Sequence, residues 1–343
     1  VLLHVERVHG SYAAAGLVLA TMSIGQAVSG PLTSRWMGAW GMRRVLSLTL
    51  VVCSSAVLTL ALVPLPVPAM MAVALVAGLS TPPIQPAVRT IYPKLVNSRQ
   101  LTPLFALDAS AQEIIWVAGP VVATLVATQI ATSAAILLCA AKLIIGGIWF
   151  ISSPEVGRVR IPRSKRRFGV VLRKPTVLLT TVVGFLLVGS CAAVEVGVVA
   201  VFGHDGPQAG FILAIWSIGS LVGGRALGHV PISPWSLARR MTVVFIGTAA
   251  AIIMVDEFWW LSIMLLVSGI GLAPALAVIF ASVSSSVKFS DPPEAYGWVG
   301  TGQLIGAAAG SAVAGFLIDG VGHVGAFYAA AGFALVGFIA AVI

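Results

Sequence analysis

Residues 15–35 read AGLVLATMSIGQAVSGPLTSR, and residues 209–229 read AGFILAIWSIGSLVGGRALGH. The two stretches are identical at nine of 21 positions without a gap, at an offset of 194 residues. Further matches follow at an offset of 191 residues: Gly78 and Pro83 with Gly269 and Pro274, and Gln112, Gly119, Val122 and Ala123 with Gln303, Gly310, Val313 and Ala314. Because these matches keep their order at a nearly constant offset, we predict an internal repeat.

The composition is that of an integral membrane protein. Hydrophobic residues make up 59% of the chain and charged residues 9%, and the mean hydropathy is +1.04. A soluble domain carries about 25% charged residues on its surface. Disorder requires low hydrophobicity, so both alternatives are excluded.

The apolar stretches predict an all-α protein with eleven membrane spans, since each crossing needs about 20 apolar residues. The spans are expected at residues 11–31, 44–64, 67–91, 104–128, 131–152, 175–202, 209–228, 241–256, 258–286, 297–318 and 322–343. The stretch at 241–256 is the shortest, although Arg239 and Arg240 can extend it by snorkelling.

The basic residues orient these spans. All of the 20 Lys and Arg residues except Arg7 and Lys142 fall on one side, which the positive-inside rule makes cytoplasmic. The net charge of +9 therefore reflects topology and attraction to anionic lipid headgroups at the cytoplasmic loops, and we expect no nucleic-acid partner. The N-terminus is then outside, so we expect the chain to be a fragment that lacks one preceding helix.

Both copies of the repeat have the same membrane direction. We therefore predict two parallel six-helix halves, at residues 1–152 and 175–343, joined by a basic cytoplasmic loop at 153–174. This arrangement resembles the major facilitator superfamily of transporters, here with eleven of twelve spans and of bacterial type.

A motif between the first two spans supports the resemblance. It resembles the family's cytoplasmic signature Gly-x-Leu-x-Asp-Arg-x-Gly-x-Arg-Arg and consists of Gly30, Ser34, Arg35, Gly41, Arg43 and Arg44. In the family this loop clamps the two halves in one state. Ser34 replaces the usual aspartate, and about four residues are inserted before Gly41, so the gating pair is in doubt.

Two ionisable residues are predicted at matching depth. Glu113 and Lys142 each lie about 14–15 Å from the cytoplasmic ends of consecutive antiparallel spans. One interpretation is an ion pair that holds the helices together, which is the reading we favour. The other is that Glu113 exchanges a proton during transport while Lys142 tunes its pKa.

Three further residues are substrate or proton candidates. Glu195 has no basic residue nearby in sequence and lies in a helix that lines the cavity in the family, so it is expected either to bind a cation or proton or to snorkel. Gln85 lies in the proline-rich segment Pro82–Pro86, whose broken backbone is tolerated against protein or a water-lined cavity. Trp216 either stacks on a substrate or packs in the protein.

The resemblance implies a secondary transporter of the bacterial cytoplasmic membrane, working by alternating access as proton-coupled efflux of a small organic solute. We expect a monomer driven by the proton gradient, with no cofactor and no metal site. Two alternatives are a transport-dead sensor or scaffold of the same fold, which Ser34 favours, and a membrane-embedded enzyme. The enzyme is disfavoured because no HExxH or GxxxxGK[ST] motif occurs.

Overall fold

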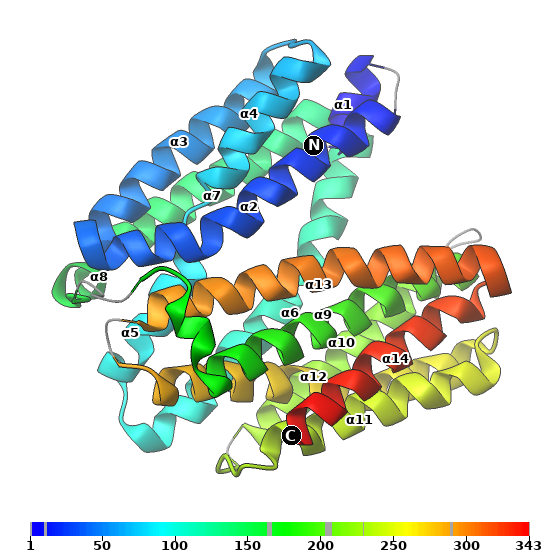
Figure 1. The fold of residues 1–343 in the computed structure, drawn as a ribbon. Coiled ribbons are helices and arrows are strands. Elements are labelled where there is room, and N and C mark those ends of the chain that lie inside the picture. Colours follow the sequence, from blue (N-terminus) through cyan, green and yellow to red (C-terminus); the bar gives the residue numbers. More distant parts are fainter. Residues whose placement is uncertain are drawn as a thin grey trace. The chain divides into compact units, whose positions relative to one another are not determined.

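The computed structural model describes residues 2–9, 12–162, 167–202, 208–228, 230–288 and 291–342. This part of the chain contains helices and no strands (Figure 1). The elements are α1 (Leu2–His9), α2 (Tyr12–Trp40), α3 (Met42–Leu62), α4 (Val67–Leu79), α5 (Ile84–Leu95), α6 (Ser98–Gln129), α7 (Thr132–Ser152), α8 (Pro154–Arg158), η1 (Val170–Arg173), α9 (Pro175–Phe202), α10 (Gln208–Leu227), α11 (Ser236–Ala251), η2 (Ile252–Met254), α12 (Phe258–Ser286), α13 (Pro292–Val321) and α14 (Val324–Val342).

Hydropathy located the spans well. Within the described residues, ten helices or broken helices are long and apolar enough to cross a membrane. The other predicted span corresponds to α6, a helix of 32 residues in which several side chains lie outside the described part. The all-helical membrane fold is therefore confirmed.

Three predicted boundaries were wrong. The expected loop at 32–44 is helical, since α2 runs through Pro31 to Trp40 and only Gly41 separates it from α3. The span expected at 241–256 begins at Ser236, because Arg239 and Arg240 are part of α11. The span expected at 297–318 begins at Pro292, where proline suits the first turn of a helix.

The predicted break at the prolines is confirmed. α4 ends at Leu79 and α5 begins at Ile84, although the two together form one span of 29 residues. Between them, Ser80 donates to the carbonyl oxygen of Val76 and Thr81 to that of Ala77. The carbonyl oxygen of Val76 also accepts the backbone amide of Ser80, so these side chains add hydrogen bonds to carbonyls in the last turn of α4.

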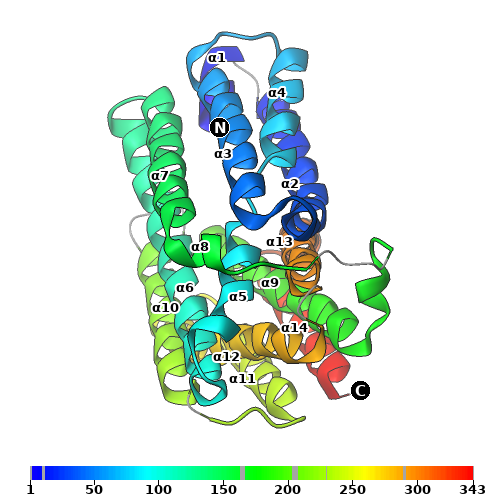
Figure 2. The ribbon, with the colours of Figure 1, turned by 90° about the vertical axis from the view of Figure 1, so that its left-hand side faces the viewer.

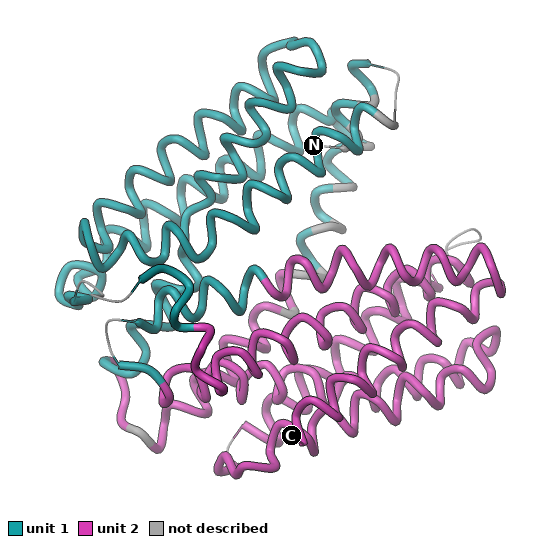
Figure 3. Tube along the Cα trace, viewed as in Figure 1, with its two compact units in different colours: residues 1–94, 118–171, 287–301 teal, residues 95–117, 172–286, 302–343 magenta. Residues whose placement is uncertain are grey.

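The chain divides into two compact units (Figure 3). Unit 1 comprises residues 1–94, 118–171 and 287–301, and unit 2 comprises residues 95–117, 172–286 and 302–343. In unit 1, α2, α3, α4 and α7 pack side by side (Figures 1 and 2). In unit 2, α12 packs on α10 and α11, and α14 packs on α9 and α11. The division into halves at 1–152 and 175–343 follows the repeat instead, and it stays a prediction.

The repeat is visible as matching helix contacts within the units. In unit 1, a side chain at Gly78 would overlap the carbonyl oxygen of Met22, and in unit 2 one at Gly269 would overlap that of Trp216. Met22 and Trp216 are related by the 194-residue offset, and the two glycines by the 191-residue offset. α2 thus crosses α4 as α10 crosses α12, because small residues allow backbones to approach closely in membranes.

A second matching contact explains the composition of the units. In unit 1, Gly30 of α2 faces Gly297 and Thr301 of α13, and in unit 2, Gly224 of α10 faces Ala106 and Ser110 of α6. Repeat offsets of 194 and 191 residues relate the two sets. These contacts place the first part of α13 with unit 1 and the first part of α6 with unit 2.

Candidate functional site

The carboxylate of Glu294 is the centre of a polar cluster in unit 1. Glu294 lies in the first turn of α13, and its side chain is only 5% exposed. The Arg35 Nη1 donates to Glu294 Oε2 at 2.9 Å, and the backbone amide of Gly169 donates to Oε1 at 2.8 Å. Both carboxylate oxygens are therefore satisfied by charge-assisted or amide hydrogen bonds, as a buried charge requires.

Two aromatic rings complete this cluster. The Arg35 guanidinium carbon lies 5.8 Å from the centre of the Phe168 ring, within the range of a cation–π contact. The Phe168 ring lies 5.6 Å from that of Trp298, one turn after Glu294. Gly169 has a φ of 79°, a conformation that favours glycine. We call these five residues, Arg35, Phe168, Gly169, Glu294 and Trp298, the Glu294 cluster.

The Glu294 cluster joins three segments distant in sequence. Arg35 comes from α2, Phe168 and Gly169 from the end of the predicted basic loop, and Glu294 and Trp298 from α13. One and a half turns before Arg35, Gly30 makes the close approach to Gly297, and Thr301 donates to the carbonyl oxygen of Ala27 at 2.6 Å. The motif residues Gly30 and Arg35 thus both contact α13. Residues 163–166 of the basic loop lie outside the described part of the chain.

Ser34, which replaces the usual aspartate, is completely buried. Its hydroxyl has no hydrogen-bond partner among the described residues. An ionised aspartate at this buried position would need a compensating cation or hydrogen-bond donors. The carboxylate that pairs with the neighbouring Arg35 belongs instead to Glu294 of α13.

The remaining motif residues form the junction of α2 and α3. Gly41 has a φ of 89° and lies between the helices. The exposed Arg43 donates from Nε to the carbonyl oxygen of Ile151 at 3.1 Å and from Nη2 to that of Ser153 at 3.3 Å. It therefore satisfies carbonyls at the C-terminus of α7, where the helix dipole also favours a cation. Arg44 is exposed.

The predicted insertion before Gly41 has a simple structural result. Four residues add about one turn to an α-helix. Since α2 is continuous to Trp40, the extra residues lengthen the helix rather than form a loop.

Of the predicted Glu113–Lys142 pair, only the side chain of Lys142 lies in the described part of the structure. Lys142 is exposed on α7 in unit 1 and has no ion-pair partner among the described residues. Glu113 lies on α6, and its side chain is outside the described part of the structure. The pairing stays a prediction.

Glu195 lies on α9, seven residues before its end at Phe202, and its side chain is exposed. Its neighbours Val194 and Val198 are buried, so the carboxylate points away from the packed face of the helix. Within the described residues no hydrogen bond or salt bridge reaches Glu195.

The other two candidates differ in accessibility. Gln85 is exposed at the second position of α5, directly after the proline break. Trp216 is buried on α10, 7% exposed, and packs against Gly269 of α12. Its position supports the packing interpretation over substrate stacking. No group of three or more His, Cys, Asp or Glu residues within the described ranges is placed to hold a metal ion.

The fold and the motif agree with a comparison of the chain with family models. The model of the Major Facilitator Superfamily matches residues 1–255 and 193–343. The chain belongs to this superfamily. It is therefore a multi-pass secondary transporter that binds small-molecule substrates, and not an enzyme. No curated protein sequence matches the chain significantly.

Solved superfamily structures share the fold at low sequence identity. The human organic anion transporter MFSD10 is 18% identical with a TM-score of 0.73, and the match covers 96% of this chain and 84% of that one. A bacterial homologue of the iron transporter ferroportin in an outward-facing state is 13% identical with a TM-score of 0.77, over 100% and 93% of the chains. The E. coli fucose:proton symporter FucP is 12% identical with a TM-score of 0.74, over 99% and 93%.

Sequence reasoning missed two buried charges. Glu294 fell in the expected loop before the span at 297–318, so its carboxylate was not considered as a partner for Arg35. The sequence Pro292-Pro293-Glu294 was the available signal, because proline and an acid both favour the first turn of a helix. Arg89 was expected near the cytoplasmic end and explained by topology, but it is 1% exposed on α5.

Proposed function

We propose that this transporter exports a small amphipathic or cationic organic solute in exchange for protons, by alternating access, as a monomer in a bacterial cytoplasmic membrane. One observation carries the proposal: Glu195 is an acid within a membrane span, its side chain is exposed, and no described residue neutralises it. An ionisable residue in a span is costly and is by default functional.

A single accessible carboxylate provides a direct mechanism for exchange. When Glu195 is ionised, it attracts a cationic solute, and when it is protonated, that attraction is lost. Proton and solute therefore compete for one group, and solute leaves when the proton binds. Gln85 on α5 is the preferred neutral contact for the solute, since an amide offers both donors and an acceptor.

The Glu294 cluster supports the gating part of this proposal. Alternating access requires contacts that hold one state and break in another. Arg35 and Glu294 form such a contact between α2 and α13. The transport-dead alternative depended on the missing aspartate at Ser34. A carboxylate from α13 now accompanies Arg35, which weakens that argument.

The similarity to these solved structures does not identify the transported solute. They are an organic anion transporter, a homologue of an iron transporter and a fucose:proton symporter. Because function depends on the site and not on the fold, the preference for a cation rests on Glu195 and stays a proposal. The same applies to the direction of transport.

The decisive experiment is transport by the full-length protein in proteoliposomes with an imposed pH gradient, using ethidium as an amphipathic cationic probe. We expect gradient-driven ethidium movement in wild type, its loss in Glu195→Gln and its retention in Glu257→Gln, which removes an exposed acid at the start of α12. Gradient-driven movement in Glu195→Gln would contradict the coupling role. Glu113→Gln separates the two interpretations of Glu113, because loss of coupling there indicates proton exchange by that residue.

A ligand screen tests the solute class independently. A ligand that binds only the folded protein stabilises it by about 2.7 kcal/mol at 100 times its dissociation constant. Thermal shifts with cationic drugs and none with sugars, amino acids or organic acids support the proposed class. Shifts with organic acids alone would contradict it.

A further inference from the structure

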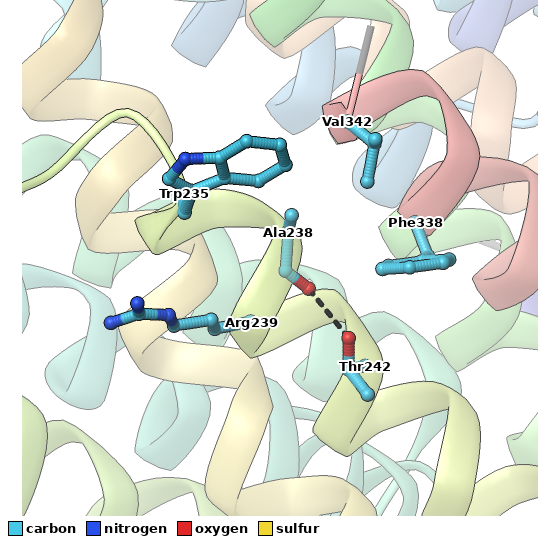
Figure 4. A pocket seen from close by; sticks show the side chains of 6 residues that line it. All are labelled: Trp235, Ala238, Arg239, Thr242, Phe338 and Val342. Carbon is cyan, nitrogen blue, oxygen red and sulfur yellow. Dashed lines mark hydrogen bonds between the residues drawn. The ribbon is translucent and has the colours of Figure 1, made fainter.

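A surface groove lies between α11 and α14 in unit 2. It has a volume of about 480 Å³ and is lined by Trp235, Ala238, Arg239, Thr242, Phe338 and Val342. Figure 4 shows Phe338 and Val342 of α14 on one side of the groove and the guanidinium of Arg239 on the other. Trp235, which precedes α11, and Ala238 and Thr242 of α11 lie between them.

The charge of this groove is positive without compensation. Arg239 is exposed and has no ion-pair partner among the described residues. The sequence contains no Asp or Glu between Asp205 and Asp256, nor after Asp319. Neither α11 nor α14 therefore contributes a carboxylate, and an anion in the groove meets no like charge.

The neighbouring arginine, Arg240, is buried and contacts the protein instead of lining the groove. It is 6% exposed, and its Nη2 donates at 3.5 Å to the carbonyl oxygen of Leu227, the last residue of α10. Arg240 thus supports a helix end within the protein, while Arg239, one residue earlier, extends outward. Thr242 already donates its hydroxyl to the carbonyl oxygen of Ala238 at 3.0 Å, so Arg239 is the charged donor that the groove offers.

The apolar part of the groove suits a hydrocarbon chain at the edge of the membrane. Trp235 is the N-cap of α11 and is 54% exposed, and tryptophan is enriched at membrane–water interfaces. Val342 is also exposed, and Phe338 is half-buried. The groove lies at the end of α11 that the basic residues place on the cytoplasmic side.

We propose that this groove binds an anionic glycerophospholipid of the cytoplasmic leaflet. Arg239 holds the phosphate, and one acyl chain lies against Trp235, Phe338 and Val342. Basic pockets between transmembrane helices on this side of a membrane bind acidic headgroups by this combination of charge and apolar surface. The inference depends on the membrane topology but not on the transported solute or its coupling ion.

The test is lipid binding by the purified full-length protein in detergent, measured by native mass spectrometry with phosphatidylglycerol and phosphatidylcholine of the same acyl chains. We expect phosphatidylglycerol to bind more tightly, and Arg239→Gln to weaken its binding about fivefold, the contribution of one basic residue near an anionic membrane surface. Phosphatidylcholine also carries a phosphate, but its choline cation offsets that charge, so Arg239→Gln is expected to weaken its binding less. Arg225→Gln is the matched control, because Arg225 is an exposed arginine of unit 2 on the same membrane side but outside the groove.

A second variant tests the apolar contact separately. Trp235→Ala is expected to weaken both lipids, since it removes hydrocarbon surface and no charge. Equal losses in Arg239→Gln and Arg225→Gln would show general surface attraction and overturn the proposal. Equal affinity of wild type for the two lipids, or no effect of Trp235→Ala on either, would also overturn it.

Discussion

Arg35 and Glu294 are 259 residues apart in the sequence, and their side chains meet with 2.9 Å between Nη1 and Oε2. In the signature motif of the superfamily an aspartate usually precedes the arginine, at the position that Ser34 occupies in this chain. This chain provides the carboxylate from the partner helix α13 instead. The ion pair thus joins α2 to α13 directly, at the same crossing as Gly30 and Gly297.

We predict that Arg35 and Glu294 are energetically coupled. Glu294→Gln is expected to cost about 2 kcal/mol of unfolding free energy, because hydrogen bonds to charged groups contribute about 1.5–3 kcal/mol. The double variant Arg35→Gln/Glu294→Gln is expected to cost less than the sum of the single variants, by about 1–2 kcal/mol. Thermal unfolding in detergent micelles measures this cycle.

An exposed contact between a carboxylate and a histidine is the control for this cycle. Asp256 lies 2.9 Å from His323, with side-chain exposures of 72% and 45%. Solvent screens such a pair, so Asp256→Asn is expected to leave stability nearly unchanged. Additive effects of Arg35→Gln and Glu294→Gln on the unfolding free energy would show that the ion pair does not contribute to stability.

The buried hydroxyl of Ser34 gives a second prediction. Because it has no described partner, Ser34→Ala is expected to be neutral or to stabilise by up to about 1 kcal/mol, as an unsatisfied buried group is costly. Ser34→Asp is expected to destabilise, since it places a carboxylate at a completely buried position. The melting temperatures of both variants measure this.

Ser54 is the matched control for Ser34. It is also buried, but its hydroxyl donates to the carbonyl oxygen of Leu50 at 2.6 Å. Ser54→Ala therefore loses a hydrogen bond of about 1 kcal/mol. A destabilisation by Ser34→Ala as large as that by Ser54→Ala would reveal a partner for the Ser34 hydroxyl.

The spans could be predicted from the sequence because a membrane permits few backbone conformations. Amides and carbonyls in hydrocarbon must pair within a helix, so length and hydropathy suffice to locate each crossing. The break before Ile84 was also readable, since prolines remove helical hydrogen bonds. The end of α2 was not readable, because Arg35 resembled the start of a loop, and no local pattern signals that its side chain meets Glu294 of α13.

The candidate site was predicted only in part for the same reason. Glu195 was recognisable, since a charge within an apolar run is a local signal. The pairing of Arg35 with Glu294 joins residues whose separation no local pattern encodes. For Trp216 the sequence left substrate stacking and packing open, because its burial against Gly269 depends on how α10 crosses α12.

The crossing of α2 and α13 gives a third prediction. A side chain at Gly297 would lie 2.6 Å from both the carbonyl oxygen of Gly30 and Cα of Pro31. Since these are backbone atoms, Gly297→Ala is expected to destabilise by about 1–3 kcal/mol through overpacking. Gly300 lies on the same helix, and a Cβ at its position would meet no atom within 4 Å, so Gly300→Ala is expected to stabilise by up to about 1 kcal/mol. Equal melting temperatures of the two variants would mean that the helices separate freely at this crossing.

The last prediction concerns pH and the contact between α1 and α7 in unit 1. His4 on α1 lies with Nδ1 3.1 Å from Oγ1 of Thr132 at the start of α7. Burial lowers the pKa of His4 below its usual 6.5, because the charged imidazolium is poorly solvated there. The unfolded chain therefore binds more protons than the folded one at mildly acidic pH.

Stability from His4 is thus fully present above pH 6.5 and is lost as the pH falls below that value toward the lowered pKa. We expect the melting temperature to decrease between pH 8 and pH 5, and the decrease to be smaller in His4→Gln, which cannot titrate. Thr132→Val is the complementary variant, since it removes the hydrogen-bond partner but keeps a titrating imidazole, so its pH dependence should persist. If His4→Gln and wild type lose stability in parallel as the pH falls, the titrating group lies elsewhere in the protein.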